Sequence, residues 1–340
     1  MTRKERRQYF KERNRKSGGY LLRKKIANVI FRICRAVLIF GLCFLILQPL
    51  LHKISLCFMT RDDLFDRTVI SVPRHFSISS IKMAWKLLYE FKPFWTSISV
   101  GVVIGIISVF ACTLVGYGFA RFKFPFKNVW FACVILLIIV PPQTLLTPMY
   151  LIFADFDVFG LISRFNGGKG LNLLGSLWAY VAVCAGCAGY KSGLYIYMMR
   201  QHFRNEPKEL EEAAWVDGCG KFRTFWSILL PGARPMMVSC FLFSFVWWWT
   251  DGVYSRIFFS RGQGWYTVSN CLSGVTERLG HEYKQLMGIA SSSGNNFVPT
   301  AYANQVLAAA TMITLVPLIV IYLLAQKSFV ESISQSGIKG

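Results

Sequence analysis

Acidic side chains and histidines are scarce in this sequence of 340 residues. There are 17 Asp and Glu against 38 Lys and Arg, and the four histidines are scattered along the chain. The HExxH pattern, which places two zinc ligands on one helix face, is absent, and so is a nucleophile elbow of the GxSxG type. The sequence offers no cluster for metal-dependent or nucleophilic catalysis. We therefore expect a protein that is not an enzyme and that needs no cofactor or metal.

A phosphate-binding loop of the GxxxxGK[ST] type is also missing. The two Gly-Lys pairs, Gly168-Lys169 and Gly220-Lys221, lack both the upstream glycine and the following Ser or Thr. That pattern is needed because its backbone amides cradle the phosphates while the Lys and hydroxyl side chains bind phosphate and magnesium. The chain thus has no such means of binding a nucleoside triphosphate.

The ten cysteines do not form the pattern of a disulfide framework. Eight of them lie in or beside hydrophobic runs, where a free Cys behaves as a small apolar residue. The pair Cys184-x-x-Cys187 has a redox or metal spacing, but it lies within an apolar run and no second pair accompanies it. We interpret the cysteines as packing residues.

Long hydrophobic runs dominate the composition, which is 54% hydrophobic and 16% charged. About twenty apolar residues cross a bilayer as a helix, and only helices or closed barrels satisfy the backbone there. The sequence therefore predicts an all-α polytopic membrane protein with six transmembrane helices, over the runs 36–59, 94–120, 128–154, 171–199, 235–259 and 301–326. Pro141 and Pro142 are expected to break the third of them.

The excess of basic residues is placed as a membrane protein would place it. Residues 1–25 carry eleven Lys and Arg against two Glu, directly before the first hydrophobic run. Basic segments beside a span remain on the cytoplasmic side and meet anionic lipid, so nucleic acid is not expected as a partner. An RNA-binding tail is the other reading of this segment. Six spans with both termini in the cytoplasm agree with the charges of most loops, while the 60–93 loop, with six basic and four acidic residues, is a mild exception.

These features divide the chain into five parts. We predict a basic cytoplasmic tail over residues 1–35, a first transmembrane helix over 36–59 and an extracytoplasmic loop over 60–93. A transmembrane core follows over 94–326, with a cytoplasmic loop at 200–235, and a cytoplasmic tail completes the chain at 327–340. The bilayer of the plasma membrane is the expected location.

The loop from Glu206 to Pro235 is polar and amphipathic although hydrophobic runs flank it. Pro207 precedes a short helical pattern in which Glu209, Glu211 and Glu212 fall in the first turn, where carboxylates complement the helix dipole. Asp217-Gly218 is a helix stop, and a second helix is expected over 221–230, closed by Pro231. The sequence predicts a helix, a glycine turn and a helix at the cytoplasmic face.

This loop resembles the EAA motif of the permease subunits of ATP-binding-cassette (ABC) importers. The resemblance rests on Glu212-Ala213-Ala214, then Asp217-Gly218, then Ile228-Leu229-Leu230-Pro231. The segments LVGYGFARFKFP at 114–125 and VPPQ at 140–143 resemble the carbohydrate branch, as does the ending GIKG at 337–340. Over residues 36–340 the chain is similar to the second permease subunit of maltose-type importers. The alternative interpretation of this loop is an ordinary amphipathic surface helix with a glycine cap.

The resemblance implies a type I ABC importer permease fold, a cytoplasmic coupling helix and several partners. These partners are a second homologous permease in a heterodimer, an ABC ATPase dimer and an extracytoplasmic solute-binding protein, besides membrane lipid. Glu212 would pair with a basic group of the ATPase and Gly218 would permit the turn, while the small Ala213 and Ala214 would let the helix lie in a groove of the partner. Asp217, beside Gly218, is the fifth residue that the resemblance assigns to contact with the ATPase. Closure of the ATPases would then rock the spans between inward- and outward-facing states.

The substrate path is expected near Trp247, Trp248, Trp249, Asp251 and Tyr254. Aromatic faces stack on sugar C–H surfaces and a carboxylate accepts hydroxyl hydrogen bonds. Successive helical residues lie about 100° apart, so at most one or two of the tryptophans line a cavity. An aromatic belt at the outer interface is the other reading.

Lys191 is the one charge in the run 171–199. An intramembrane charge is costly and functional by default. Lys191 would meet a substrate carboxylate or hydroxyl, pair with Asp251, or extend to the interface.

The function expected is import of a carbohydrate, and an oligosaccharide fits best. A permease for another solute, such as an amino acid, a peptide or an organic anion, has the same architecture. A membrane enzyme or a stand-alone channel would need catalytic groups inside the spans or activity without partners, and the span residues offer no such cluster.

Overall fold

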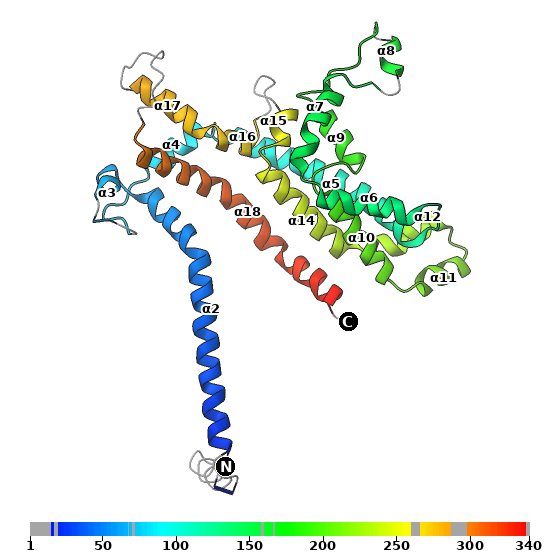
Figure 1. Ribbon diagram of the computed structural model, residues 1–340, viewed down its shortest axis with the longest axis horizontal. Helices are drawn as coiled ribbons and strands as arrows, with labels where there is room; N and C mark the ends of the chain where they lie inside the picture. The colour runs from blue at the N-terminus through cyan, green and yellow to red at the C-terminus, as the bar shows by residue number, and fades with distance from the viewer. Residues whose placement is uncertain are drawn as a thin grey trace. The chain divides into compact units, whose positions relative to one another are not determined.

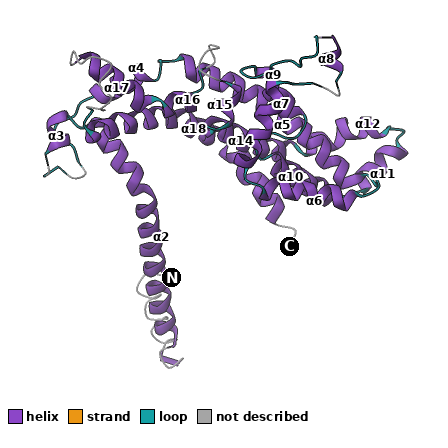
Figure 2. Ribbon diagram, turned by 45° about the horizontal axis from the view of Figure 1, so that its top comes forward, coloured by secondary structure: helices purple, strands orange, loops and turns teal. Residues whose placement is uncertain are grey.

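Helices make up almost all the regular structure of the chain. The computed structural model describes residues 15–16, 20–66, 68–69, 72–157, 160–165, 167–259, 266–286 and 298–337, and these contain helices and loops without a strand (Figure 2). The all-α class expected from the sequence is confirmed. The chain divides into two compact units, residues 1–77 and 78–340, which are described separately.

The first unit consists of one long helix and a short loop domain. Helix α2 (Tyr20–Phe58) has 39 residues with Pro49 inside it, and its part Arg23–Phe58 is long and apolar enough to cross a membrane (Figure 1). The helix begins sixteen residues before the predicted span at 36–59, because the basic residues before the span are good helix formers too. Helix α3 (Arg61–Phe65) follows, and the pairing of Met59 with Phe76 closes the loop.

Asp63 holds this loop together. Its Oδ2 accepts hydrogen bonds from the backbone N–H groups of His75 at 2.8 Å and of Arg74 at 2.9 Å, and its Oδ1 lies 3.3 Å from His75 Nδ1. The amide of His75 is the main cause that lowers the pKa of Asp63 below its usual 3.8. Hydrogen bonds to a carboxylate favour its charged form, so the closed loop and the ionised Asp63 stabilise each other.

We expect the stability of this loop to depend on pH through Asp63. The folded-state pKa is depressed, so its contribution is present above the unfolded value of 3.8 and is lost as the pH falls through the folded value. Amide hydrogen exchange of Arg74 and His75, corrected for intrinsic rates, should therefore accelerate on acidification. In Asp63→Asn it should already be fast at pH 7 and should depend less on pH. Asp62→Asn, which changes an exposed neighbour, is the matched control; identical profiles for wild type and Asp63→Asn would contradict this role.

The second unit is a bundle around helix α5 (Lys92–Arg121). Helix α4 (Ser79–Leu87) precedes α5, and α6 (Lys127–Ile139), a 3₁₀ turn (Pro142–Leu145) and α7 (Leu146–Ala154) follow it. The remaining elements before the polar loop are α8 (Leu161–Phe165), α9 (Leu177–Ala185) and α10 (Ser192–Asn205). Helix α5 packs against α9, α10 and α14 (Figure 1).

The polar loop and the C-terminal part complete this unit. The loop contains α11 (Glu209–Val216), α12 (Lys221–Thr224), a π turn η2 (Phe225–Leu229) and α13 (Leu230–Gly232). After it come α14 (Arg234–Thr250), α15 (Tyr254–Phe258), α16 (Val268–Ser273), α17 (Val275–Leu286) and α18 (Thr300–Gly337). The SSSGNN segment at 291–296, read from the sequence as linker-like, lies outside the described residues.

Close packing of α5 on α10 requires glycine at position 116. A Cβ there would lie 2.7 Å from Met199 Cβ and 3.0 Å from the backbone nitrogen of Arg200. Gly116 therefore allows this close helix approach. Gly118 is not required for it, since a Cβ at that position would meet only the ring of Phe122 at 4.0 Å.

Two of the apolar segments are bent, and the predictions for their prolines had different outcomes. The segment with Pro141 and Pro142 bends by 105° between α6 and α7, as predicted. Pro231 does not close a helix: it lies in the first turn of α13, where a missing N–H is harmless. The chain instead bends by 71° after Gly232, before α14.

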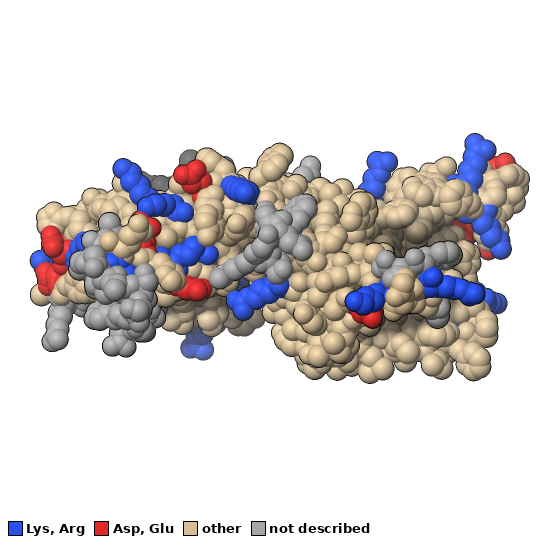
Figure 3. All heavy atoms as spheres, turned by 90° about the horizontal axis from the view of Figure 1, so that it is seen from above, with Lys and Arg blue, Asp and Glu red and all other residues tan. Residues whose placement is uncertain are grey.

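Three helices of the described chain are long and apolar enough to span a bilayer, and five spans result if each bent pair counts as one. The three are Arg23–Phe58, Lys92–Arg121 and Thr300–Gln326. The predicted span 171–199 is instead two helices, α9 and α10, separated by residues 186–191. Two non-glycine residues in this break, Cys187 and Lys191, have φ values of 55° and 61°. The face in Figure 3 shows a wide surface without charged side chains, as such helices require.

Candidate functional site

The helix–glycine turn predicted in the polar loop is present. Helix α11 has Glu209, Glu211 and Glu212 in its first turn. Gly218 ends it with φ of 82°, and its N–H donates to the carbonyl of Trp215 at 3.0 Å. The N–H of Cys219 donates to the carbonyl of Ala214 at 2.9 Å, so two carbonyls at the helix end are satisfied. The sequence at this turn requires a left-handed residue, and glycine supplies it without strain.

The two faces of α11 are unlike each other. Glu211 and Ala214 are buried, whereas Glu212, Ala213 and Asp217 are exposed, as is Gly218. Ala214, expected to lie in a groove of a partner, is only 3% exposed and packs inside this chain. Residues three apart share a helix face, so Glu211 and Ala214 are buried on the same face of α11. The surface that remains for another protein includes Glu212, Ala213 and the turn, and also the exposed apolar side chains Leu210, Trp215 and Val216.

A buried ion pair anchors α11 to the end of α5. Arg121 Nε lies 2.6 Å from Glu211 Oε1, and each side chain is only 7% exposed. Arg121 Nη2 also donates to the carbonyl oxygen of Glu206 at 2.8 Å, which ties the end of α10 to the same arginine. Sequence reasoning placed Arg121 at the inner membrane boundary and Glu211 at the helix dipole, and it missed their pairing. The sequence carries no specific signal for this pairing, because Glu209, Glu211 and Glu212 all lie in one turn of the predicted helix.

An aromatic cluster continues from this pair into the bundle. Tyr117 of α5 contacts Phe225 of η2 at 4.6 Å between ring centroids and Phe203 of α10 at 5.4 Å. Phe203 and Phe225 lie 6.2 Å apart. Aromatic pairs in such contact add about 0.5–1.5 kcal/mol each beyond their burial. Helices α5 and α10 and the π turn are thus packed into one body at the end that carries α11.

The three tryptophans at 247–249 have separate surroundings. Trp248 and Trp249 are 4% and 3% exposed, and their indole N–H groups donate to the carbonyls of Ser97 at 3.0 Å and Thr314 at 3.1 Å. These two anchor α14 between α5 and α18. Trp247 is 38% exposed and is the one of the three that is free to meet a ligand. The expectation that at most one or two would do so is consistent with this arrangement.

Lys191 lies beside Trp247 at the start of α10. Its ammonium group lies 5.4 Å from the ring centroid of Trp247 and 5.7 Å from that of Tyr190. The residue is not in the middle of a helix, as its sequence position suggested, but caps α10 in a left-handed conformation. Cation–π contacts of this kind stabilise the position of an ammonium group by about 0.5–2 kcal/mol. Lys191 makes no ion pair with a described residue, so its N–H donors can still bind a ligand.

Asp251 and Tyr254 are committed to the local fold. Asp251 accepts hydrogen bonds from the backbone N–H groups of Val253 at 3.0 Å, Tyr254 at 3.3 Å and Ser255 at 3.1 Å, and it does not pair with Lys191. It therefore ends α14 and starts α15, which divides the predicted span 235–259. Tyr254 is 2% exposed and packs edge-on against Tyr190. A cavity of about 10 Å³ remains beside Tyr180, Trp248 and Asp251, with room for at most one water.

Bent apolar helices around a central span, with an exposed helix–glycine turn tied to that span, are the arrangement of a polytopic membrane protein that can contact a partner outside the bilayer. Residues 101–335 match the family described as binding-protein-dependent transport system inner membrane component, and the chain belongs to that family. It is therefore an ABC importer permease subunit, a transport component and not itself an enzyme, that works with a binding protein in the cell membrane.

Relatives and a solved structure agree with this assignment. The chain is 28% identical over 235 residues to a probable ABC transporter permease of Pyrococcus horikoshii, covering 69% of this chain and 71% of that protein. It is 24% identical over 250 residues to the arabinooligosaccharides transport system permease protein AraQ of Bacillus subtilis, covering 74% of each. A crystal structure of a bacterial ABC transporter involved in the import of the acidic polysaccharide alginate has the same fold, with a TM-score of 0.64, 19% identity and coverage of 89% of this chain and 98% of that chain.

Proposed function

We propose that this chain carries a carbohydrate, best an oligosaccharide, across the membrane by coupling to a separate ABC ATPase through α11. The observation that carries this proposal is the division of α11 into an anchored face and an open face. Glu211 is buried against Arg121, while Glu212 and the Gly218 turn face outward. A helix held in this way can receive a force from a partner and pass it to α5.

The coupling step follows from this geometry. Glu212 would pair with a basic group of the ATPase, and Ala213 would let the partner approach closely. Closure of an ATPase dimer would displace α11, and the Arg121–Glu211 pair would carry the displacement to α5 and α10 as a rigid-body shift. Chemistry at the nucleotide stays with the ATPase, and the permease contributes motion.

The complete topology would have six spans with both termini in the cytoplasm. The broken pair α9 and α10 would form the span that composition and length alone do not count. Non-helical backbone at membrane depth is tolerated where protein or water surrounds it, so the break at 186–191 fits the wall of a path. A second homologous permease would complete that wall, and an extracytoplasmic solute-binding protein would deliver the substrate to it.

The substrate path would pass Trp247 and Lys191. An exposed indole face suits the C–H surface of a sugar, and an ammonium group suits its hydroxyls or a carboxylate. The relatives named above include a permease for arabinooligosaccharides, which supports a sugar. Trp248, Trp249, Asp251 and Tyr254 would shape the path from behind. A second candidate is an organic anion, which the ammonium of Lys191 favours because it has no ion pair with any residue that the structure describes.

Uptake by proteoliposomes tests the proposal. The chain, reconstituted with its companion permease, ATPase and binding protein, should accumulate a labelled oligosaccharide only when ATP is supplied. A panel of neutral oligosaccharides, uronate oligosaccharides and small organic acids would separate the two candidates. If the proteoliposomes take up organic acids but none of the oligosaccharides, the proposal that the substrate is a carbohydrate is wrong.

In the same assay, Lys191→Met should reduce uptake of uronate oligosaccharides more than uptake of neutral ones. A hydrogen bond to a charged group is worth about 1.5–3 kcal/mol, so a tenfold or larger loss is expected for the acidic substrate. Lys169→Met, which changes an exposed lysine away from the path, is the matched control. Equal losses for neutral and acidic substrates would exclude a role of Lys191 in binding a carboxylate.

A further inference from the structure

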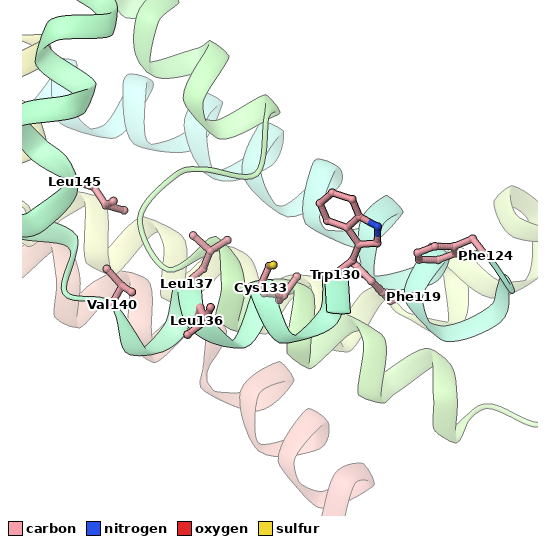
Figure 4. A pocket seen from close by; sticks show the side chains of 9 residues that line it. Phe119, Phe124, Trp130, Cys133, Leu136, Leu137, Val140 and Leu145 are labelled. Carbon is pink, nitrogen blue, oxygen red and sulfur yellow. The ribbon is translucent and has the colours of Figure 1, made fainter. Parts of the chain in front are cut away.

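An apolar groove runs along α6 on the surface of the second unit. Its volume is about 740 Å³, and its lining comes from the end of α5, the following turn, α6 and the break beyond it. Figure 4 shows Phe119 and Phe124 at one end, Trp130, Cys133 and Leu137 along its length, and Val140 and Leu145 at the other end. Almost all of this lining is hydrocarbon or aromatic, so it suits a chain of methylene groups.

Helix α6 is long enough to hold an acyl chain within one leaflet of a bilayer. Helix α6 has 13 residues, and a helix rises about 1.5 Å per residue, which gives about 20 Å. The hydrocarbon core of a bilayer is about 30 Å thick, so each leaflet contributes about 15 Å. With α6 along the bilayer normal, the groove would extend from the membrane surface that carries α11 to the Pro141–Pro142 break, about 5 Å beyond the middle of the bilayer.

Four cations lie at the surface end of the groove. Arg200 places its guanidinium 3.8 Å from the ring centroid of Phe131, and Phe131 in turn contacts the groove residue Phe119 at 5.7 Å. Lys127 lies within electrostatic reach of Arg200 and of the exposed Arg204. Lys123, also exposed, directly precedes Phe124.

These four cations have no carboxylate partner within the residues that the structure describes. Glu211 pairs with Arg121 instead, and Glu206 makes no ion pair with any of the four, its carboxylate lying 3.6 Å from His202. Like charges held together repel one another and favour an anion between them. A charged end and an apolar groove long enough for an acyl chain together suit a molecule with an anionic head and an acyl chain.

We propose that this groove binds one anionic glycerophospholipid of the leaflet on the α11 side. Its acyl chain lies along α6, and its phosphate meets Lys123, Lys127 and Arg204, with Arg200 behind them. Basic pockets at the ends of transmembrane helices bind anionic head groups in this way. An uncharged helix of a second permease would leave the four cations without counter-charges, whereas the phosphate of a lipid supplies one, so the charges favour the lipid.

Lipid retention by the full-length chain tests the site. The chain would be placed in phosphatidylcholine nanodiscs with dioleoylphosphatidylglycerol as the probe, and native mass spectrometry would count the phosphatidylglycerol retained. Lys127→Gln with Arg204→Gln should weaken retention by about fivefold per charge, or about 25-fold in all. The matched control Arg164→Gln with Lys169→Gln removes one arginine and one lysine from an exposed segment elsewhere and should leave retention unchanged.

A second variant keeps the test independent of the charges. Cys133→Trp fills the middle of the groove and should abolish retention of the tightly held phosphatidylglycerol without removing a cation. Undiminished retention in both variants overturns the proposal. A photocrosslinker at position 133 that captures a second permease chain, and not the lipid, also overturns it.

Discussion

We expect Gly218→Pro to abolish substrate-stimulated ATP hydrolysis while the chain still inserts into the membrane. Gly218 has φ of 82°, and proline is fixed near −65°, so the turn after α11 cannot form. Proline also lacks the N–H that donates to the carbonyl of Trp215. The exposed face of α11 would then no longer be presented to the ATPase. ATPase activity of the reconstituted complex, with and without loaded binding protein, measures the effect.

Two further substitutions calibrate this result. Gly218→Ala keeps the N–H and places a side chain in the left-handed region, at a cost of about 1–2 kcal/mol, so coupling should weaken without vanishing. No atom lies within 4 Å of a Cβ at this position, so the effect is one of backbone conformation and not of a clash. Gly220→Ala is the matched control, because Gly220 has φ of −69° and equally open surroundings. Normal stimulation in Gly218→Pro would reject α11 as the coupling element.

Removing one partner of the Arg121–Glu211 pair should destabilise the chain strongly. An isolated buried charge remains in each single variant, which typically costs about 3–5 kcal/mol. We expect Arg121→Met and Glu211→Met each to lower the unfolding midpoint and to uncouple uptake from hydrolysis. The double variant removes both charges and should recover most of the stability, which a chemical denaturation series in nanodiscs can measure.

Glu212→Gln separates anchoring from partner contact. Glu212 is exposed and has no ion pair among the described residues, so its loss should leave the unfolding midpoint unchanged. It should nevertheless reduce coupling, because its proposed partner lies on the ATPase.

For the ion pair itself, a wild-type midpoint in Glu211→Met, or a double variant no more stable than the singles, would show that the ion pair does not hold α11.

The sequence predicted those features that a short segment determines by itself. The break at Pro141–Pro142 follows from proline alone, and the turn at Gly218 follows from a glycine after a helical pattern. The break at 186–191 was not predicted, because its left-handed positions are held by Cys187 and Lys191 and not by glycine. Only the surrounding helices impose that conformation.

Contacts between segments that are distant in the sequence could not be predicted either. Nothing near Arg121 indicates that its partner is Glu211 and not Glu209 or Glu212, since all three acids lie in one turn of α11. The three tryptophans are a second example. Helical periodicity predicts only that Trp247, Trp248 and Trp249 point in different directions. Which of them are buried depends on the carbonyls of Ser97 and Thr314, on two other helices.

The two ends of α10 have a joint consequence for transport. The helix begins directly after Lys191 and ends directly before Glu206, whose carbonyl Arg121 holds, and its 14 residues extend over about 21 Å. Gly116 presses α5 against its middle. If α11 is the coupling element proposed above, a displacement there would be passed along α10 to the ammonium beside Trp247. The ATPase cycle would then set the timing of access to the proposed path, without a separate gate.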